Sequence, residues 1–360
     1  MSVDRLSDWR EPLAPDWRAQ ARALSAGLKA ASSDRPELAA TLRRLGGMRL
    51  GDGERLQLRR LVALARNSGG LPGFRSFRLM LVSNRTTSFF AADLEVAGVA
   101  RGLLIEAIET EYDSVGALAF NPAYRPAAGP FDAVLLMLDA SYFPLAQAVA
   151  DLASEQSQTD EIKGLLTSTV SALREKASAP VIVANVVTPL DHDQSLTDSA
   201  TPGTASRRTA IINTILGSMA EQRLCIPFDL ASVAARVGLN TYFDPMRMHQ
   251  AKVPFSLDAG PVVADALSAL IAALAGRSGR ALVLDLDSTV WGGVIADDGQ
   301  AGIIVGQGSA EGEAFLAVQN YALAMRSKGV VLAVCSKNLE ATAREPFQSH
   351  PDMALREEHI

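Results

Sequence analysis

The first part of the chain has the hydrophobic period of helices. Apolar residues recur at three- and four-residue spacing from Trp17 to about Ala65, with Arg or Lys between them. This spacing predicts amphipathic helices, and no strand pattern is visible there. Ser-Gly-Gly-Leu-Pro-Gly at 68–73 then interrupts the period. We therefore predict a helical N-terminal segment over residues 1–73.

A different pattern fills residues 74–278. Short apolar runs alternate with helix-length amphipathic segments, and the runs are FRLMLVSN, LLIEAIE, AVLLMLD, PVIVANVV and LCIPFDL. Such alternation predicts a parallel α/β sheet. The polar stretch 191–208 follows the fourth run, where open α/β sheets place ligand-handling loops. A plain surface loop has the same composition, so both interpretations stay open.

A polar joint precedes the third region, residues 279–360, and we place a domain boundary near Gly279. There the pattern predicts a strand (ALVLDLD), a hairpin with the turn signal DDGQ, a helix (EGEAFLAVQNYALAMRSKG) and a second strand (VVLAVCSKN). The whole chain is thus predicted to be an α/β protein with a helical N-terminal segment.

Composition restricts the binding partners and the cellular compartment that we expect for this protein. The 360 residues include 34 Lys and Arg against 40 Asp and Glu, a net charge of -6 that argues against a nucleic-acid partner. Two cysteines fit a reducing compartment, and the N-terminus lacks a secretory pattern, so we expect a cytoplasmic protein. The most apolar stretch is interrupted by Asp265, which argues against a membrane span.

The strongest chemical signal lies where the ALVLDLD strand ends, at Asp285 and Asp287. Side chains alternate along a strand, so the two carboxylates share a direction and favour a bound divalent cation such as Mg²⁺. The next strand ends in Ser336 and Lys337, and adjacent parallel strands bring their carboxyl ends to one edge. By itself a D-x-D-x-T motif is weak evidence for a catalytic site, because acidic residues at strand ends often cap helices.

These residues resemble a known family. The segments DLDSTVWGGVI and VCSKN, with GQGSAEGEAF between them, are similar to motifs one and two of the haloacid dehalogenase superfamily, and more narrowly to the FkbH-like proteins. The resemblance continues upstream through YFDPMRMHQAKVPFS to the strand ending in Ser83 and Asn84. It implies an SGNH-hydrolase-like α/β domain over 74–278 and a Rossmann-like haloacid dehalogenase domain, represented by its first half, over 279–360.

The resemblance also implies roles. Asp285 would be the phosphoryl-accepting nucleophile and a Mg²⁺ ligand, and Asp287 would be the general acid and base and would lend the metal its backbone carbonyl. Thr289 would support the loop, and Ser336 would hydrogen-bond the phosphoryl group. The implied substrate is 1,3-bisphosphoglycerate, a phosphorylated three-carbon compound. Its glyceryl unit passes to the phosphopantetheine thiol of an acyl carrier protein in polyketide biosynthesis.

Cys335 is the thiol next to this motif, and we consider it as a carrier of a glyceryl thioester. The alternative is a structural cysteine, because strand alternation turns Cys335 away from the direction of Ser336 and buried cysteines usually fill cores. The short interval between the two motifs leaves room only for the WGGVIADDG hairpin. We therefore expect an open site without a large lid.

The family pattern is incomplete here. The superfamily uses a later Lys and a further acidic pair, and the sequence ends before either. We expect a piece of a longer protein, while a second half from another chain and a degenerate site are alternatives. Lys337 is a candidate replacement for the missing cation, or simply the start of a helix.

Two other functions stay open. Ser83, with Asn84, Asp139, Asp244 and His249, is a candidate serine esterase or acyltransferase site. The fit to the SGNH pattern is poor, because the serine lies in V-S-N and the histidine follows the aspartate by five residues. These polar residues at strand ends are equally explained as helix caps. A non-catalytic docking module for a carrier protein is the third hypothesis.

Overall fold

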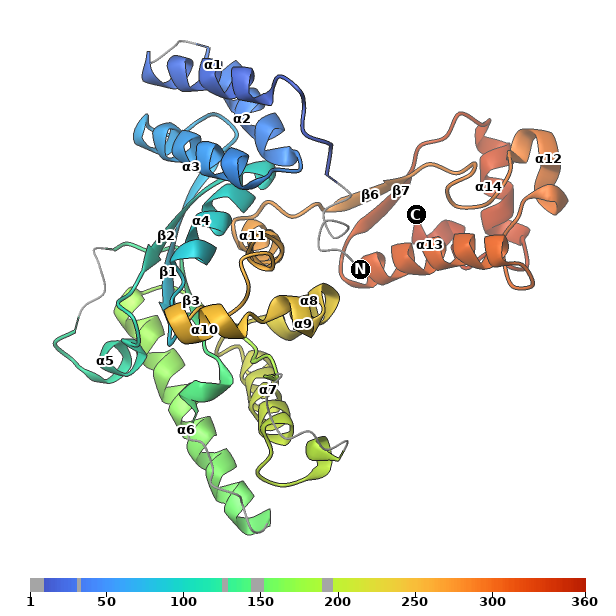
Figure 1. The fold of residues 1–360 in the computed structure, drawn as a ribbon. Coiled ribbons are helices and arrows are strands. Elements are labelled where there is room, and N and C mark those ends of the chain that lie inside the picture. Colours follow the sequence, from blue (N-terminus) through green and yellow to red (C-terminus); the bar gives the residue numbers. More distant parts are fainter. Residues whose placement is uncertain (1–9, 31–33, 125–128, 144–151, 190–196) are drawn as a thin grey trace. The chain divides into compact units, whose positions relative to one another are not determined.

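The chain folds into two compact units, Met1–Gly276 and Arg277–Ile360 (Figure 1). The structure is a computed structural model that describes residues 10–30, 34–124, 129–143, 152–189 and 197–360. The fold is a mixed α/β fold with a parallel sheet and a helical N-terminal segment, which confirms the predicted class.

Three helices form the N-terminal segment: α1 (Trp17–Lys29), α2 (Arg35–Gly47) and α3 (Asp52–Asn67). Their apolar faces bury Trp17, Leu42 and Leu61 in one cluster, which also contains Val99 and Leu104 from the sheet layer. The predicted helical period is therefore correct, and the segment packs against the sheet layer within the same unit.

The central sheet of the first unit is parallel and has the strand order β2-β1-β3-β4-β5. Its strands are β1 (Arg75–Ser83), β2 (Leu103–Glu109), β3 (Ala133–Met137), β4 (Val181–Ala184) and β5 (Ile226–Phe228). β2 to β5 lie within four of the predicted apolar runs, and β1 begins two residues before the first run, at Arg75. The strand order reverses at β1 and β3, so their carboxyl ends flank the crevice where open α/β sheets bind ligands.

Helices cover both faces of this sheet. Alternate residues of β1 divide between two cores: Leu79 packs with α4, α8 and α11, and Met80 packs with α5, α6 and α7. The helices that follow the N-terminal segment are α4 (Ser88–Ala97), α5 (Val115–Phe120), α6 (Leu152–Ala177), α7 (Ala205–Glu221), α8 (Leu230–Val237), α9 (Leu239–Tyr242), α10 (Pro245–Ala251) and α11 (Gly260–Leu274). Short 3-10 turns lie at Val99–Arg101 (η2), Ala140–Tyr142 (η3) and Asp198–Ala200 (η4).

The second unit contains a parallel pair of strands, β6 (Ala281–Leu284) and β7 (Val331–Val334), paired over their whole length. Its helices are α12 (Ile295–Gly302), α13 (Ala310–Ser327) and α14 (Glu340–Ser349), and a 3-10 turn, η5, spans Glu357–His359. Leu284, Leu286 and Trp291 are buried in its core together with Phe347 and Leu355. The two predicted strands are therefore present and adjacent.

The predicted hairpin after β6 is wrong. Gly292 and Ile304 do pair in an antiparallel bridge, with N–H···O distances of 2.8 and 2.9 Å. However, α12 lies between them in place of a tight turn. The Asp-Asp-Gly signal falls inside this helix, where Gly299 has a φ of 65° and kinks it. Glycine adopts this backbone conformation without steric cost, so the same signal serves a kink as well as a turn.

Among the residues that the structure describes, no helix is both long and apolar enough to cross a membrane.

Candidate functional site

The acidic motif lies in the loop that follows β6. The strand ends at Leu284, one residue before Asp285, so strand alternation does not set the directions of the two aspartates. Leu286 is completely buried and anchors the loop between them. Ser288 has a φ of 56°, a left-handed conformation that costs a residue with a Cβ roughly 1–2 kcal/mol. Such strain is often found at functional loops.

Asp287 is held by hydrogen bonds from three parts of the chain. Its Oδ1 accepts from the indole Nε1 of Trp291 and from the backbone N–H of Ile295, both at 3.1 Å. Its Oδ2 accepts from Nδ2 of Asn338 at 2.8 Å. The Asn338 bond joins the loop after β6 to the loop after β7, so the two motifs lie together as predicted.

These donors determine the charge of Asp287. Partial burial opposes ionisation, but the hydrogen bonds from Ile295, Asn338 and Trp291 outweigh it, so the pKa of Asp287 lies below its ordinary value. Charge-assisted hydrogen bonds of this kind favour the carboxylate. Asp287 is therefore ionised near neutral pH, a state that suits a base.

Asp285 has a different environment. Its side chain is exposed, and it has no hydrogen bond or ion pair within the described part of the chain. The backbone N–H of Cys335 donates to the carbonyl oxygen of Leu284 at 2.9 Å, so the residues that follow β6 and β7 begin side by side. Asp285 thus presents an open carboxylate at this edge.

The loop after β7 carries the other predicted residues. The Ser336 hydroxyl is half-buried and accepts from the backbone N–H of Asn338 at 3.1 Å. Cys335 is exposed, so it does not fill a core. Lys337 is also exposed and precedes α14, which begins at Glu340. The Thr289 backbone N–H donates to the carbonyl of Leu286 at 3.1 Å, which closes the acidic loop.

Two buried polar residues that the sequence interpretation missed support this loop. Gln319 of α13 is fully buried, and its Nε2 donates to the carbonyl of Val290 at 2.9 Å. Trp291 is also fully buried. The sequence does indicate that Gln319 is buried, because it lies on the apolar stripe of its helix, between Leu316 and Leu323.

The oxygen donors at the motif fit a magnesium ion with few protein ligands. Among the described residues, the Asp285 carboxylate and the Asp287 backbone carbonyl have no hydrogen-bond donor, whereas the Asp287 carboxylate is already engaged by its three donors. Within the described residues, no three His, Cys, Asp or Glu side chains gather as a metal cluster. Mg²⁺ commonly keeps several waters and binds through one or two carboxylates, so this donor set is compatible with it.

Three of the alternative hydrolase residues, Ser83, Asn84 and Asp139, lie at the carboxyl ends of β1 and β3. Asn84 donates to Asp139 through Nδ2 at 2.8 Å and accepts from the Asp139 backbone N–H at 3.1 Å. Arg85 forms an ion pair with Asp139. Burial opposes the charge of Asp139, but hydrogen bonds from Ser141, Asn84 and Arg85 hold its pKa below the ordinary value. The structure therefore brings Asn84 and Asp139 together.

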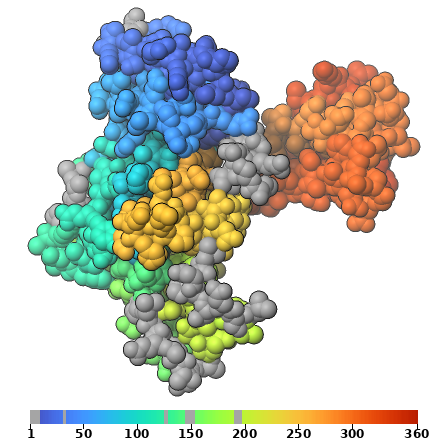
Figure 2. Space-filling model, in the orientation of Figure 1, coloured from blue at the N-terminus to red at the C-terminus, as the bar shows by residue number. Residues whose placement is uncertain are grey.

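Ser83 and His249 are not joined by a hydrogen bond within the described part of the chain. The Ser83 side chain is buried, and its Oγ accepts from the backbone N–H of Arg85 at 3.0 Å. Asp244 caps α10 by accepting from the backbone N–H of Arg247 at 3.0 Å. His249 is exposed on this helix, which lies on the surface of the first unit (Figure 2).

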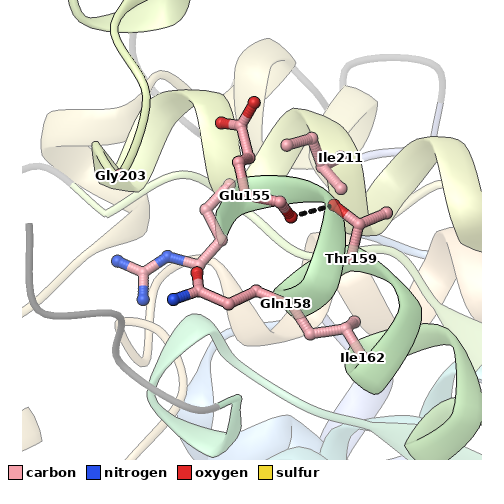
Figure 3. Close-up of a pocket in the computed structure, with 7 residues that line it drawn as sticks. Glu155, Gln158, Thr159, Ile162, Gly203 and Ile211 are labelled. Carbon is pink, nitrogen blue, oxygen red and sulfur yellow. Dashed lines mark hydrogen bonds between the residues drawn. The ribbon is translucent and has the colours of Figure 1, made fainter. Parts of the chain in front are cut away.

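A small hollow lies between α6 and α7, lined by Glu155, Gln158, Thr159 and Gly203 (Figure 3). Its volume is about 10 Å³, which is room for a single water molecule. The Thr159 hydroxyl donates to the carbonyl of Glu155 at 2.8 Å. This hollow is too small for a substrate.

Fold and site together define a two-unit α/β protein with an acidic motif at strand ends. A similar solved structure is the N-terminal part of a Bacteroides fragilis protein that contains a phosphatase domain complexed with Mg. It is 26% identical, has a TM-score of 0.70, and the match covers 80% of this chain and 76% of that chain. Because the first unit is less than 80% of the chain, the similarity extends into the second.

Two further structures are a salicylyl-acyltransferase from a tetracycline biosynthetic pathway and a carbohydrate acetylesterase from Sinorhizobium meliloti. They are 14% and 13% identical, with TM-scores of 0.35 and 0.33. The matches cover 57% and 55% of this chain and 56% and 99% of those chains. Similarities this low do not bear on function. No family model and no curated protein matches the chain.

Proposed function

We propose that the chain is a magnesium-dependent phosphatase whose reaction takes place where β6 and β7 end. The observation that carries this proposal is the 2.8 Å hydrogen bond from Asn338 to Asp287, which gathers both motifs beside the open carboxylate of Asp285. The similarity to a structure with a magnesium-bound phosphatase domain supports it.

In this proposal the Asp285 carboxylate attacks the phosphorus atom of a phosphoester, and the bond from phosphorus to the leaving oxygen breaks. The leaving oxygen keeps the electron pair and takes a proton from solvent. A water molecule then hydrolyses the aspartyl phosphate, and Asp287 accepts its proton, a role that suits an ionised carboxylate. Ser336 and the backbone of its loop orient the phosphoryl oxygens. A bound Mg²⁺ would be held by the Asp285 carboxylate and the Asp287 carbonyl and would stabilise the developing negative charge.

The finer proposal concerns the substrate. We propose 1,3-bisphosphoglycerate as the donor and an acyl carrier protein as the acceptor. A thiolate, from Cys335 or from the carrier's phosphopantetheine arm, attacks the acyl carbon, and the bond from that carbon to the phosphate oxygen breaks. Inorganic phosphate leaves with the electron pair, and a 3-phosphoglyceryl group remains as a thioester. The phosphatase step at Asp285 then removes the phosphate on its third carbon, which leaves a glyceryl thioester. The exposed position of Cys335 supports its candidacy, because a protein-bound thiol can approach it.

Phosphate release from p-nitrophenyl phosphate tests the coarser proposal. We expect release that depends on added Mg²⁺ and that falls by at least about 100-fold in Asp285→Asn. The matched control is Asp297→Asn, because Asp297 is an exposed acid on nearby α12. We expect its activity to stay within about twofold. Equal activity of Asp285→Asn and the unmodified chain would reject the site.

Intact mass measurement tests the transfer separately. Incubation with 1,3-bisphosphoglycerate, Mg²⁺ and a carrier protein should add one glyceryl mass to the carrier. If Cys335 is the intermediate thiol, the same mass should appear on the chain when the carrier is left out, and Cys335→Ser should lack it. Phosphate release without any thioester would reject the transfer and retain the phosphatase.

A further inference from the structure

The long helix of the second unit is α13 (Figure 1), and it has apolar residues on two faces. One face packs into the core of its own unit, where Ala322 and Gln319 are buried and Leu323 packs against the cluster. The second face carries Val318 and Tyr321, whose exposed fractions are 40% and 60%. A helix at a protein surface usually has polar residues on its outer side. The pattern of α13 is therefore typical of a helix that is covered on both sides.

The residues of the second face follow the spacing of a helix-packing seam. Alternating steps of three and four residues along the chain connect Glu311, Ala314, Val318, Tyr321, Met325 and Lys328. We call these six residues the α13 seam. Such steps keep residues in one line on a helix, and two helices pack along lines of this kind in coiled coils. Ala314 is exposed like Val318 and Tyr321, and Met325 is half-buried. A contiguous exposed apolar patch marks an interaction surface, whereas scattered apolar residues do not.

Small residues lie beside the seam. Ala317 precedes Tyr321 by four residues and Ala324 follows it by three, and both are exposed. Helix axes pack about 8–10 Å apart, and the side chains at the contact set the distance, so alanines permit a close approach. The Tyr321 ring between two alanines is suited to insertion between the residues of a facing helix. The size pattern therefore favours another helix as the occupant of this face.

The two ends of the seam carry opposite charges. Glu311 lies seven residues before Val318, and Lys328 lies seven residues after Tyr321. Seven residues are close to two helical turns, so each charged residue lies nearly in line with its apolar counterpart. Both charged side chains are exposed, and neither has a hydrogen bond or an ion pair within the described part of the chain. A facing helix therefore needs a base opposite Glu311 and an acid opposite Lys328.

A second copy of the seam, running in the opposite direction, meets this requirement. With a two-fold axis between Val318 and Tyr321, the Val318 side chain of each copy faces the partner's Tyr321. Ala314 then faces the partner's Met325, a small residue against a long one, because both are equally far from the axis along the helix. The charged ends meet acid against base, and the helix dipoles are antiparallel. The seam is thus complementary to itself, which is the property of a two-fold symmetric interface.

We propose that two copies of this chain associate through α13 as an antiparallel, two-fold symmetric pair of helices. Val318 and Tyr321 form the centre of the contact, and the two pairs of Glu311 with Lys328 close its ends. One helix from each copy makes an interface smaller than the standard size of roughly 1,600 Å², so the association is weak and reversible. The proposal is independent of the proposed phosphatase, because no seam residue belongs to the acidic motif.

Exposed positions on α13 provide matched variants. Val318→Glu and Tyr321→Glu each place an unpaired carboxylate from both copies in the apolar centre of the contact, which opposes association. Both residues are exposed in the single chain, so the variants should fold. Asn320→Glu is the control, because Asn320 is exposed on the same helix and lies outside the seam.

Sedimentation equilibrium of the full chain, up to about 200 µM, tests the proposal. We expect a monomer–dimer equilibrium with a Kd of about 1–100 µM. Val318→Glu and Tyr321→Glu should each raise the Kd by at least about 30-fold. Asn320→Glu should leave it within about threefold.

Charge exchange tests the antiparallel direction. Lys328→Glu and Glu311→Lys should each weaken the dimer by at least about threefold at low salt, because like charges then meet at both ends. The double variant restores opposite charges and should return to within about twofold of the unmodified chain. In a parallel pair each charged residue would face its own copy, so neither single exchange would change the affinity.

A chain that stays monomeric at about 200 µM overturns the proposal. A dimer that persists in Val318→Glu and Tyr321→Glu, with the thermal unfolding midpoints retained, shows that the contact lies elsewhere. If one of these variants does not fold, the other decides the question. Unchanged affinity in both single charge exchanges, or no recovery in the double variant, overturns the antiparallel arrangement.

Discussion

Gln319 gives the sharpest test of how the acidic loop is supported. Its amide makes four contacts from a fully buried position on α13. Nε2 donates to the Val290 carbonyl at 2.9 Å and also contacts the Met353 sulfur. Oε1 accepts from the backbone N–H groups of Ala354 and Leu355 at 2.8 and 3.0 Å. One side chain therefore joins α13, the acidic loop and the C-terminal segment.

Gln319→Leu keeps the size of the side chain and removes these bonds. One backbone carbonyl and two backbone N–H groups then lose their partner. Each unsatisfied buried group costs about 1–3 kcal/mol, and the gain from burying an apolar side chain offsets part of the total. We expect the second unit to lose about 2–5 kcal/mol of stability.

Hydrogen exchange followed by mass spectrometry reports this loss locally. Peptides that contain Val290 and Ala354 should exchange faster, whereas peptides from the first unit should be unchanged. Asn320→Leu is the control, because Asn320 is the next residue on the same helix and is exposed. Its effect should be within about 0.5 kcal/mol. A loss under about 1 kcal/mol in Gln319→Leu would refute the reasoning.

Three further predictions concern pH, the motif bond and helix glycines. Burial raises the pKa of Asp93 to about 6, although the nearby Arg55 acts to lower it. The protonated Asp93 side chain therefore contributes to stability below about pH 4, and this contribution is lost as the pH rises through 6. Asp93→Asn should therefore raise the free energy of unfolding at pH 8, measured by urea denaturation, by about 1–3 kcal/mol and leave it unchanged near pH 4. A lower free energy of unfolding at pH 8 would show that the Arg55 interaction dominates. Asn338→Ala should lower Mg²⁺-dependent phosphate release about tenfold, with the thermal midpoint little changed, because the lost bond to Asp287 orients a half-buried carboxylate. Normal phosphate release by Asn338→Ala would show that Asn338 is not part of the site. Gly217→Ala should raise the stability by about 0.5–1 kcal/mol because the new Cβ meets open space, whereas Gly46→Ala should lower it because that Cβ would overlap the side chain of Val99. Thermal unfolding of both variants checks the signs.

The sheet strands could be predicted because their pattern is local. The apolar run of β3 is continuous and all five of its residues are buried, as expected for a strand covered on both faces. The pairing of β6 with β7 also followed from a general rule for neighbouring parallel strands. By contrast, a cavity at the carboxyl ends of β1 and β3 is lined by residues from Arg85 to Pro254, and no local pattern contains that set.

The acidic site was only partly predictable. The residue types and spacing of Asp285, Asp287 and Ser336 indicate the site in the sequence. The environments of the two aspartates nevertheless differ, because the strand ends at Leu284, before both of them. The Asn338 bond depends on the fold of a loop more than fifty residues away. Sequence spacing predicts that such loops meet, but it does not predict which side chain makes the bond.

The wrong hairpin and the ionisation of Asp287 have the same origin. Ile295 is the first residue of α12, and the first N–H groups of a helix have no partner inside it. One of them donates to Asp287, and Asp298 caps the same end by accepting from the Val294 N–H at 2.8 Å. A tight hairpin would have used these acids in a turn and would have offered no helix N–H to the carboxylate. The helix therefore both replaces the hairpin and helps to keep Asp287 ionised beside the open Asp285.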